Sequence, residues 1–181
     1  MTDTRVAVLV GSLRADSLNR KLAEILRDEA PEGVTLDFVD GLADLPFYNE
    51  DLDAGTAPAA AQAVRDEVAA ADRVLVVTPE YNGTMPAVIN NAIDWLSRPY
   101  GSGALTGKPL AIIGAAPTPY GAKWSHADAA RSAGIAGAVV VEDAIVSQPA
   151  HEIDVLTDPD VRKRLHDALA ALVAYQVSTA A

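Results

Sequence analysis

The stretch RVLVVTPEYNGTMPAVINNAIDWLSRP, residues 73–99, decides the fold of this chain. Its apolar run Val74–Val77 is short and β-branched, which predicts a strand buried on both faces of a parallel sheet. The segment Thr78–Thr84 ends that strand with turn residues, because Asn82-Gly83 accepts positive φ. Ala87 to Ser97 then carry apolar residues at helical spacing. A strand, a polar loop and a helix in this order mark the place where open α/β sheets bind ligands.

A second stretch of the same kind lies near the start. Arg5–Val10 reads RVAVLV and predicts another buried strand, and GSLRADSLNR, residues 11–20, leads from it into a helix. The first N–H groups of a helix lack intrahelical partners and its dipole favours an anion, so this loop suits a phosphate group. Polar side chains able to donate to that phosphate are Ser12, Arg14, Ser17 and Asn19.

A simpler interpretation of this loop stays open. Ser17 or Asp16 can be an ordinary helix N-cap, and Arg14 a solvated charge. The loop is neither G-x-G-x-x-G nor G-x-x-x-x-G-K-[ST], which removes the main support for a dinucleotide or nucleoside triphosphate site.

Together, GSLRADSLNR and PEYNGTMPAVINNAIDWLSRP resemble the NADPH-dependent FMN reductase family, whose flavodoxin-like members include quinone, chromate and azo-dye reductases. The resemblance implies bound FMN with its phosphate in the first loop, and Phe47 and Tyr48 near the mouth of the flavin site. The more frequent role for such aromatic residues is to fill space under their own loop. The segment from Ala116 to Trp124 departs from the Ser- and Gly-rich loop of relatives. Implied cofactor contacts are Gly11, Ser12, Arg14, Ser17, Leu18, Asn19, Pro79, Glu80, Tyr81, Asn82 and Gly83.

The order of the remaining elements predicts the architecture. Further strands are expected at 33–39, 109–115 and 138–145, with helices at 58–71 and 125–133 (capped by Ser125) and a last helix opened by Asp158-Pro159. Alternating strands and helices predict an α/β fold: a flavodoxin-like three-layer sandwich with a five-stranded parallel sheet of order 2-1-3-4-5. In that order the two loops follow neighbouring strands. One domain over residues 1–181 is expected.

The expected activity is that of an FMN-dependent oxidoreductase with NADPH or NADH as donor. The resemblance implies a small-molecule acceptor, such as a quinone, flavin, azo dye or metal oxyanion. Because nothing in the sequence suggests a second site, donor and acceptor are expected to bind alternately, in ping-pong fashion. The flavin is the electron sink, so no catalytic side chain is expected, and backbone N–H groups from Glu80 to Gly83 would face it. The alternative is a flavodoxin-type electron carrier, which Arg14 disfavours. A receiver domain lacks its acidic cluster after the first strand.

The amino-acid composition limits the kinds of partner that this protein is expected to bind. Fourteen Lys and Arg against 25 Asp and Glu give a net charge of −11, which disfavours nucleic acid and anionic membranes. The chain has no cysteine, and its longest apolar runs are far shorter than the roughly 18 residues of a membrane span. The start, MTDTRVAVLVGS, does not resemble a signal peptide, so a cytoplasmic location is expected. The resemblance implies a homodimer or homotetramer, with the Phe47-Tyr48 loop and Asp94-Trp95 at the boundary.

The histidines and the acidic residues of the long connection are not expected to take part in a reaction. His126, His151 and His166 are scattered and are expected on the surface or at helix ends, without a metal or a catalytic triad. Acidic residues in the long connection 40–56 lack the full calcium-loop pattern, so Glu50, Asp51 and Asp53 are expected to be solvated.

Overall fold

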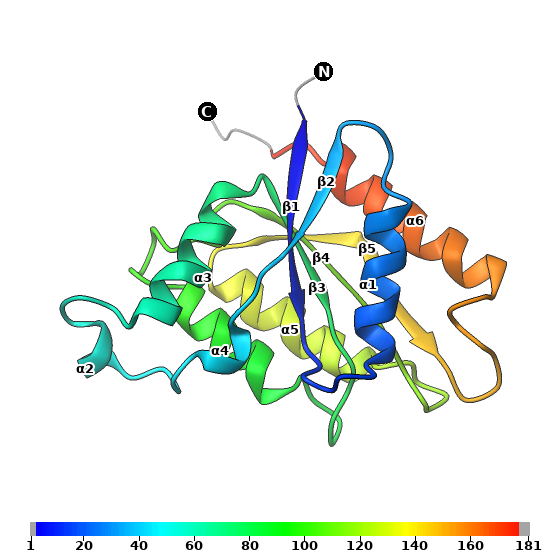
Figure 1. Cartoon of the computed structure of the whole chain (residues 1–181), viewed down its shortest axis with the longest axis horizontal. Helices are drawn as coiled ribbons and strands as arrows, with labels where there is room; N and C mark the ends of the chain where they lie inside the picture. The colour runs from blue at the N-terminus through cyan, green and yellow to red at the C-terminus, as the bar shows by residue number, and fades with distance from the viewer. Residues whose placement is uncertain (1–2, 178–181) are drawn as a thin grey trace.

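The structure is a computed structural model that describes residues 3–177, and a five-stranded parallel sheet forms its centre (Figure 1). The strand order is β2-β1-β3-β4-β5, as predicted. The predicted domain limits at residues 1 and 181 lie outside the described residues. The strands are β1 (Thr4–Val10), β2 (Val34–Phe38), β3 (Arg73–Val77), β4 (Pro109–Ala116) and β5 (Val139–Pro149).

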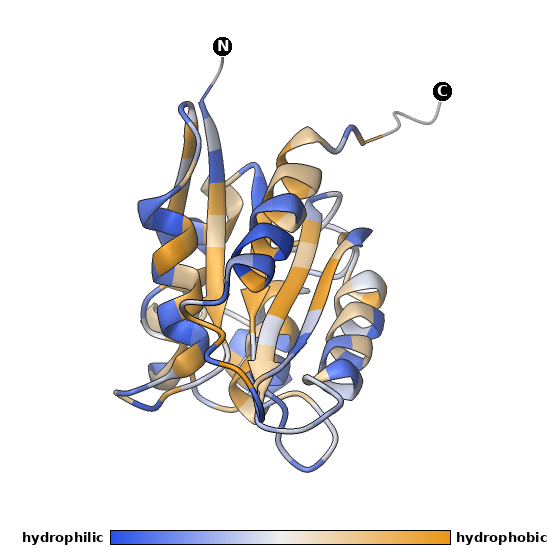
Figure 2. Cartoon of the chain, turned by 90° about the vertical axis from the view of Figure 1, so that its right-hand side faces the viewer, coloured by the Kyte–Doolittle hydropathy of each residue, from blue (hydrophilic) through white to orange (hydrophobic). Residues whose placement is uncertain are grey.

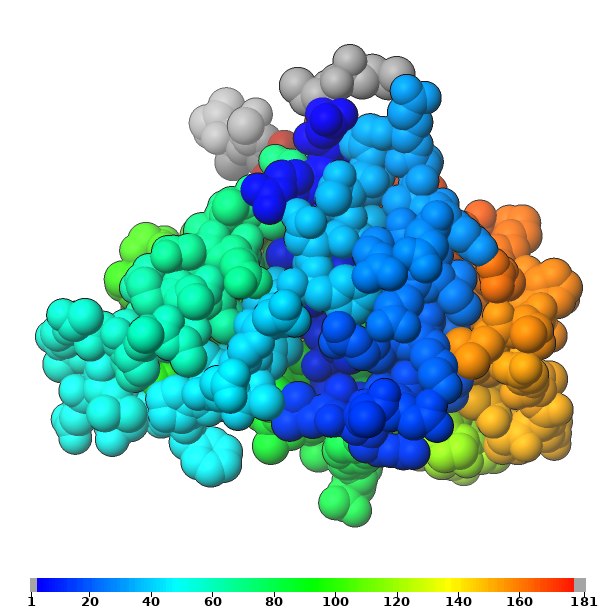
Figure 3. All heavy atoms as spheres, viewed as in Figure 1, coloured from blue at the N-terminus to red at the C-terminus, as the bar shows by residue number. Residues whose placement is uncertain are grey.

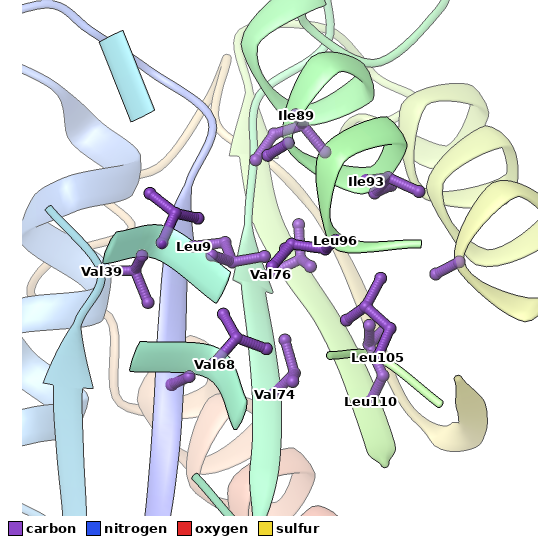
Figure 4. Close-up of a cluster of buried hydrophobic side chains, with 14 of the residues drawn as sticks. Leu9, Val39, Val68, Val74, Val76, Ile89, Ile93, Leu96, Leu105 and Leu110 are labelled. Atoms are coloured by element: carbon purple, nitrogen blue, oxygen red, sulfur yellow. The ribbon is translucent and has the colours of Figure 1, made fainter. Parts of the chain in front are cut away.

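Helices cover both faces of the sheet (Figure 1). The α-helices are α1 (Leu18–Asp28), α2 (Glu50–Asp53), α3 (Ala59–Ala70), α4 (Ala87–Leu96), α5 (Lys123–Ile135) and α6 (Pro159–Ala174), with a short 3-10 helix η1 (Leu42–Asp44). Successive strand residues point to opposite faces, so each strand serves two cores. Leu9 and Val76 pack with α3, α4 and α5, as Figure 4 shows, whereas Val8 and Leu75 pack with α1 and α6. Figure 2 shows the central strands as mostly apolar along their length.

Two predicted boundaries were wrong. β5 continues to Pro149, because Ser147 and Gln148 pair with Gly114 and Ala115 although they are not apolar. The helix expected to begin after a Ser125 cap begins at Lys123 and has no capping side chain of its own. A carboxylate from another loop occupies its N-terminus, as described below.

The long connection 40–56 contains η1 and α2 and is tied to the body of the protein. The guanidinium of Arg65 donates two hydrogen bonds to the Asp53 carboxylate, at 2.8 and 2.7 Å. The Arg65 hydrogen bond lowers the pKa of Asp53. Solvation was therefore the wrong expectation for Asp53, whose side chain is only 14% exposed. Among the described helices, none has both the length and the apolar character needed to cross a bilayer.

Candidate functional site

Three loops meet at the carboxyl edge of the sheet, along the lower side of Figure 1. They are Gly11–Ser17 after β1, Thr78–Thr84 after β3 and Pro117–Ala122 after β4. The first two are in direct contact, because the Gly11 N–H donates to the Val77 carbonyl at 2.9 Å. A Cβ at Gly11 would lie 2.2 Å from the Thr78 hydroxyl, so glycine is required for this approach. Figure 3 shows the loops side by side on the lower surface.

The loop Gly11–Ser17 leaves its donors available for a ligand. Arg14 is exposed, and no hydrogen bond within residues 3–177 uses its guanidinium or the Ser12 hydroxyl. A pocket of about 310 Å³ beside the loop is lined in part by Ser12 and Arg14. The Asp16 carboxylate pairs with Lys21, which lowers the pKa of Asp16 and offsets its repulsion toward an anion.

Ser17 and Asn19 differ from the sequence-based expectation. Ser17 is the N-cap of α1, since its Oγ accepts from the Arg20 N–H at 3.2 Å, but its hydroxyl hydrogen remains able to donate. Asn19 exchanges two hydrogen bonds with the Ala115 backbone, at 2.9 and 2.8 Å, and is buried. Asn19 therefore positions α1 against β4, and since its side-chain NH2 group has a second hydrogen, its role as a phosphate donor stays a prediction. Leu18 is half-buried and packs on the α1 side of the core.

The loop Thr78–Thr84 ends in a tight two-residue turn. Tyr81 and Thr84 exchange backbone hydrogen bonds of 3.1 Å, with Asn82 at φ 53° and Gly83 at φ 74° between them. The positive φ predicted for Asn82-Gly83 is therefore confirmed. The turn engages the Tyr81 N–H, while the Glu80, Asn82 and Gly83 N–H groups form no hydrogen bonds with the described part of the chain.

Side chains fix this loop to α5. The Glu80 carboxylate accepts from the Trp124 and Ser125 N–H groups at 3.0 and 3.2 Å, and so fills the helix N-terminus. The Thr84 hydroxyl donates to Asp128 at 2.6 Å, and the Ser125 hydroxyl to the Pro79 carbonyl at 2.8 Å. Only the backbone of Glu80 is thus free to face a ligand.

The loop after β4 contains polar and aromatic groups at the same edge. Thr118 Oγ1 is buried without a hydrogen-bond partner in residues 3–177. The exposed rings of Tyr120 and Trp124 have centroids 4.5 Å apart, and the Lys123 ammonium lies 4.9 Å from each. A buried hydroxyl is normally hydrogen-bonded, so Thr118 Oγ1 is available to a ligand or a water molecule at this edge.

The Phe47-Tyr48 segment lies beside the start of α4. Tyr48 is half-buried against Trp95, whereas Phe47 is 83% exposed, so the space-filling role expected for both holds only for Tyr48. Together with Thr84 they border a pocket of about 430 Å³. Trp95 is 0% exposed and its indole donates to the Pro46 carbonyl at 2.8 Å. Placing Trp95 at a subunit boundary was therefore wrong.

The three histidines lie apart from one another, and the burial of one of them was not predicted. His126 was expected at the surface or at a helix end; it lies in the first turn of α5 but is 1% exposed, with both ring nitrogens in hydrogen bonds. Burial lowers its pKa. His151 is exposed, and His166 pairs with Glu29. Nothing in the sequence near His126 indicated burial, since its partners are distant in the chain.

The two loops fit a ligand with a phosphate and a planar ring. The Arg14 guanidinium and the Ser12 hydroxyl supply donors at the N-terminal side of α1, where an anion is favoured. The unpartnered N–H groups after β3 supply donors for a ring, and Tyr81 is exposed beside them. FMN has both parts. The individual contacts of these residues with the cofactor stay predictions.

Comparisons with known proteins identify the family of this chain. The family model for NADPH-dependent FMN reductase matches residues 4–152. A 2-hydroxy-1,4-benzoquinone reductase from Burkholderia is 50% identical over 110 residues, which are 61% of this chain and 59% of that protein. A quinone reductase from Pseudomonas putida is 49% identical over 112 residues, covering 62% and 60%. The alignments thus span about 60% of the length of these curated relatives.

A solved structure extends the similarity over nearly the whole chain. The flavoenzyme NAD(P)H:(acceptor) oxidoreductase FerB from Paracoccus denitrificans has a TM-score of 0.83 and is 36% identical, covering 94% of this chain and 96% of that one. The family resemblance read from the two loop motifs is therefore confirmed, and the protein belongs to the NADPH-dependent FMN reductase family.

Proposed function

We propose that this protein is an FMN-dependent NAD(P)H oxidoreductase that reduces a small quinone-like acceptor. The observation that carries the proposal is the pairing of two loops with free donors, after β1 and β3, in the family that the comparisons identify. When bound, FMN supplies the hydride-accepting and hydride-donating chemistry. The protein holds the phosphate near Ser12 and Arg14, directs N–H donors from the loop after β3, and needs no side chain to move a proton at the reacting ring.

The acceptor class is the finer part of this proposal. The Burkholderia and Pseudomonas relatives are named for quinone substrates. In this chain the exposed rings of Tyr120 and Trp124 offer a planar surface at the same edge, and Lys123 adds a positive charge there. A planar acceptor with a negative charge, such as a hydroxyquinone anion, suits that combination.

Binding of FMN by the first loop is tested with Arg14→Ala. A charged hydrogen bond contributes about 1.5–3 kcal/mol, so the variant should bind FMN roughly ten- to a hundredfold more weakly by fluorescence titration. Riboflavin has no phosphate and should bind both forms equally. Arg27→Ala, at the opposite end of α1, removes the same charge and should leave FMN affinity unchanged. Equal FMN affinity in Arg14→Ala and Arg27→Ala would contradict the placement of the phosphate.

The reaction is tested by kinetics. One edge with one set of donors must serve NAD(P)H and acceptor in turn, so double-reciprocal plots should give parallel lines. Intersecting lines would contradict alternate use of the site. Anaerobic addition of NADPH should bleach the bound flavin rapidly; slow bleaching by NADPH, with rapid bleaching by a reduced protein donor, would favour an electron carrier.

A cytoplasmic location and assembly into a homodimer or homotetramer belong to the same proposal. Exposed Phe47, beside the pocket at the start of α4, is the residue that supports a subunit contact there, because aromatic side chains are enriched at interface cores. Light scattering at micromolar concentration should show a mass above the 18.9 kDa of one chain. A mass of 18.9 kDa would refute the assembly.

A further inference from the structure

The first turn of α5 holds the backbone of the loop after β3 in one orientation. The Ser125 hydroxyl donates to the Pro79 carbonyl at 2.8 Å, and the His126 ring lies with Nε2 3.1 Å from the Thr78 carbonyl. Ser125 and His126 are 0% and 1% exposed, so both hydrogen bonds are shielded from water. Two successive carbonyls of the loop are therefore directed inward, toward α5.

The direction of the Pro79 carbonyl fixes the direction of the next N–H group in the chain. The Pro79 carbonyl and the Glu80 N–H belong to one planar trans peptide and point in opposite directions. Because Ser125 holds the carbonyl inward, the Glu80 N–H points away from α5, and it has no partner in residues 3–177. The preceding peptide has no donor, because residue 79 is proline. Glu80 is thus the first residue of the loop that can present an N–H to a ligand.

His126 completes the arrangement as a neutral group. A carbonyl only accepts, so Nε2 carries the hydrogen toward Thr78, and Nδ1 accepts from the Ser147 hydroxyl at 2.8 Å. The ring therefore connects the end of β3 with β5 through α5. Neither nitrogen is left for a substrate, which separates His126 from any role as an acid or base.

We call the two hydrogen bonds from Ser125 and His126 to the loop carbonyls the clamp. Other charged groups near the clamp also join the loop after β3 to α5. The Glu80 carboxylate accepts from the α5 N-terminus, and Asp128, one turn further along α5, accepts from Thr84. Lys123 lies on the outside, over the Tyr120 and Trp124 rings. The loop is thus bound to one helix at both of its ends, while its turn remains open.

We propose that Ser125 and His126 are positioning residues that hold the Glu80 N–H toward the flavin ring, and so favour the reduced state of the bound cofactor. The inference rests on the proposed function, because the donor has a purpose only if FMN binds at this edge. A fixed N–H donor stabilises the negative charge that a reduced flavin carries more strongly than the neutral oxidised ring. A donor that is free to rotate loses part of that preference.

The first test uses the protein without FMN, so it does not depend on the proposed function. In Ser125→Ala the Pro79 carbonyl loses its shorter hydrogen bond and keeps only that from the Thr78 hydroxyl at 3.2 Å, so the NMR order parameter of the Glu80 N–H should fall from about 0.85 to below about 0.6. Ser132→Ala is the matched control, since it makes the same change in the last turn of α5, away from the loop. An order parameter in Ser125→Ala equal to that of the control would overturn the clamp.

The second test uses the protein with FMN. In Ser125→Ala the ratio of affinities for reduced and oxidised FMN should fall about tenfold, which is a drop of about 30 mV in midpoint potential for a two-electron couple. His126→Gln keeps an amide donor in reach of the Thr78 carbonyl and should retain most of the wild-type potential, while His126→Leu should lower it. If His126→Leu does not fold, Ser125→Ala and His126→Gln still decide the matter. A potential in Ser125→Ala equal to or above the wild-type value would overturn the positioning role.

The outcomes separate the two proposals. A wild-type protein that fails to bind FMN would remove the proposed function, whereas the order parameter would still show whether the clamp exists. Normal FMN binding together with an unchanged order parameter and potential would remove the clamp alone.

Discussion

Gly114 connects the two halves of the candidate site, and replacing it by alanine should damage both. A Cβ at this position would lie 2.1 Å from the Thr78 carbonyl oxygen and 2.8 Å from the Asn19 Oδ1. Real Cβ contacts are almost never below 3.0 Å, so the carbonyl would have to move by at least 0.9 Å (3.0 − 2.1). The Thr78 carbonyl cannot move freely, because the N–H of the same residue donates a hydrogen bond to the Ile113 carbonyl at 3.0 Å. Asn19 is likewise held by its two hydrogen bonds with the Ala115 backbone.

Overpacking of a rigid site typically costs about 1–3 kcal/mol, and a clash on two sides places Gly114→Ala at about 3 kcal/mol. For a domain of this size that corresponds to a fall in Tm of roughly 6–12 °C. Calorimetry of the protein without FMN measures it. Gly55→Ala is the matched control, since nothing lies within 4 Å of its added Cβ and its φ is not positive.

The same change should weaken FMN binding, because it displaces Thr78 and Asn19 together. Titration well below the Tm of the variant should show a loss of more than tenfold relative to Gly55→Ala. An equal Tm in the two variants would refute the packing argument. A lower Tm with unchanged FMN affinity would refute the coupling of the loops.

Three further changes have defined outcomes. Asn19→Ala leaves the buried Ala115 N–H without its acceptor and should lower the unfolding free energy by about 1–3 kcal/mol in urea titrations, whereas full stability would contradict its positioning role. Arg65→Ala leaves the Asp53 carboxylate unpaired and should lower the unfolding free energy at pH 7 by about 1–3 kcal/mol. This difference from the wild type should shrink as the pH falls through the lowered pKa of Asp53, and a difference that is constant with pH would contradict the pairing. His126 has a lowered pKa in the folded protein, so below about pH 6.5 the unfolded chain binds a proton more readily and the unfolding free energy falls. In His126→Gln the unfolding free energy should depend less on pH between pH 7 and 5, and an unchanged dependence would contradict the lowered pKa of His126.

The fold could be predicted because its signals are local. Runs such as Val74–Val77 are continuous and apolar, which only a strand covered on both faces allows, and Pro159 after Asp158 marks a helix start without reference to the rest of the chain. The Asn82-Gly83 turn was equally local. β5 was predicted too short because Ser147 and Gln148 are strand residues only through pairing with β4, and their own side chains do not indicate it.

The candidate site was predictable in location but not in its internal connections. Strand order alone brings the loops after β1 and β3 together, so their residues could be named. The role of Asn19 depends on Ala115, 96 residues later, and that of Ser125 on Pro79, 46 residues earlier. Hydrogen bonds of this range leave no periodic pattern in a sequence. The burial of His126 was not predicted for the same reason, since its ring partners are Thr78 and Ser147.

These connections explain how a protein with a net charge of −11 can hold an anionic cofactor. At physiological ionic strength a charge is screened over about 8 Å, so the donors next to the ligand decide its binding more than the total charge does. The acidic side chains within the two loops are already engaged: Asp16 by Lys21, and Glu80 by the N-terminus of α5. Arg14, in contrast, has no acidic partner among the ion pairs of the described chain. Arg14 and the free N–H groups therefore lie at the same edge of the sheet, where the carboxylates of the two loops themselves are already engaged by other parts of the fold.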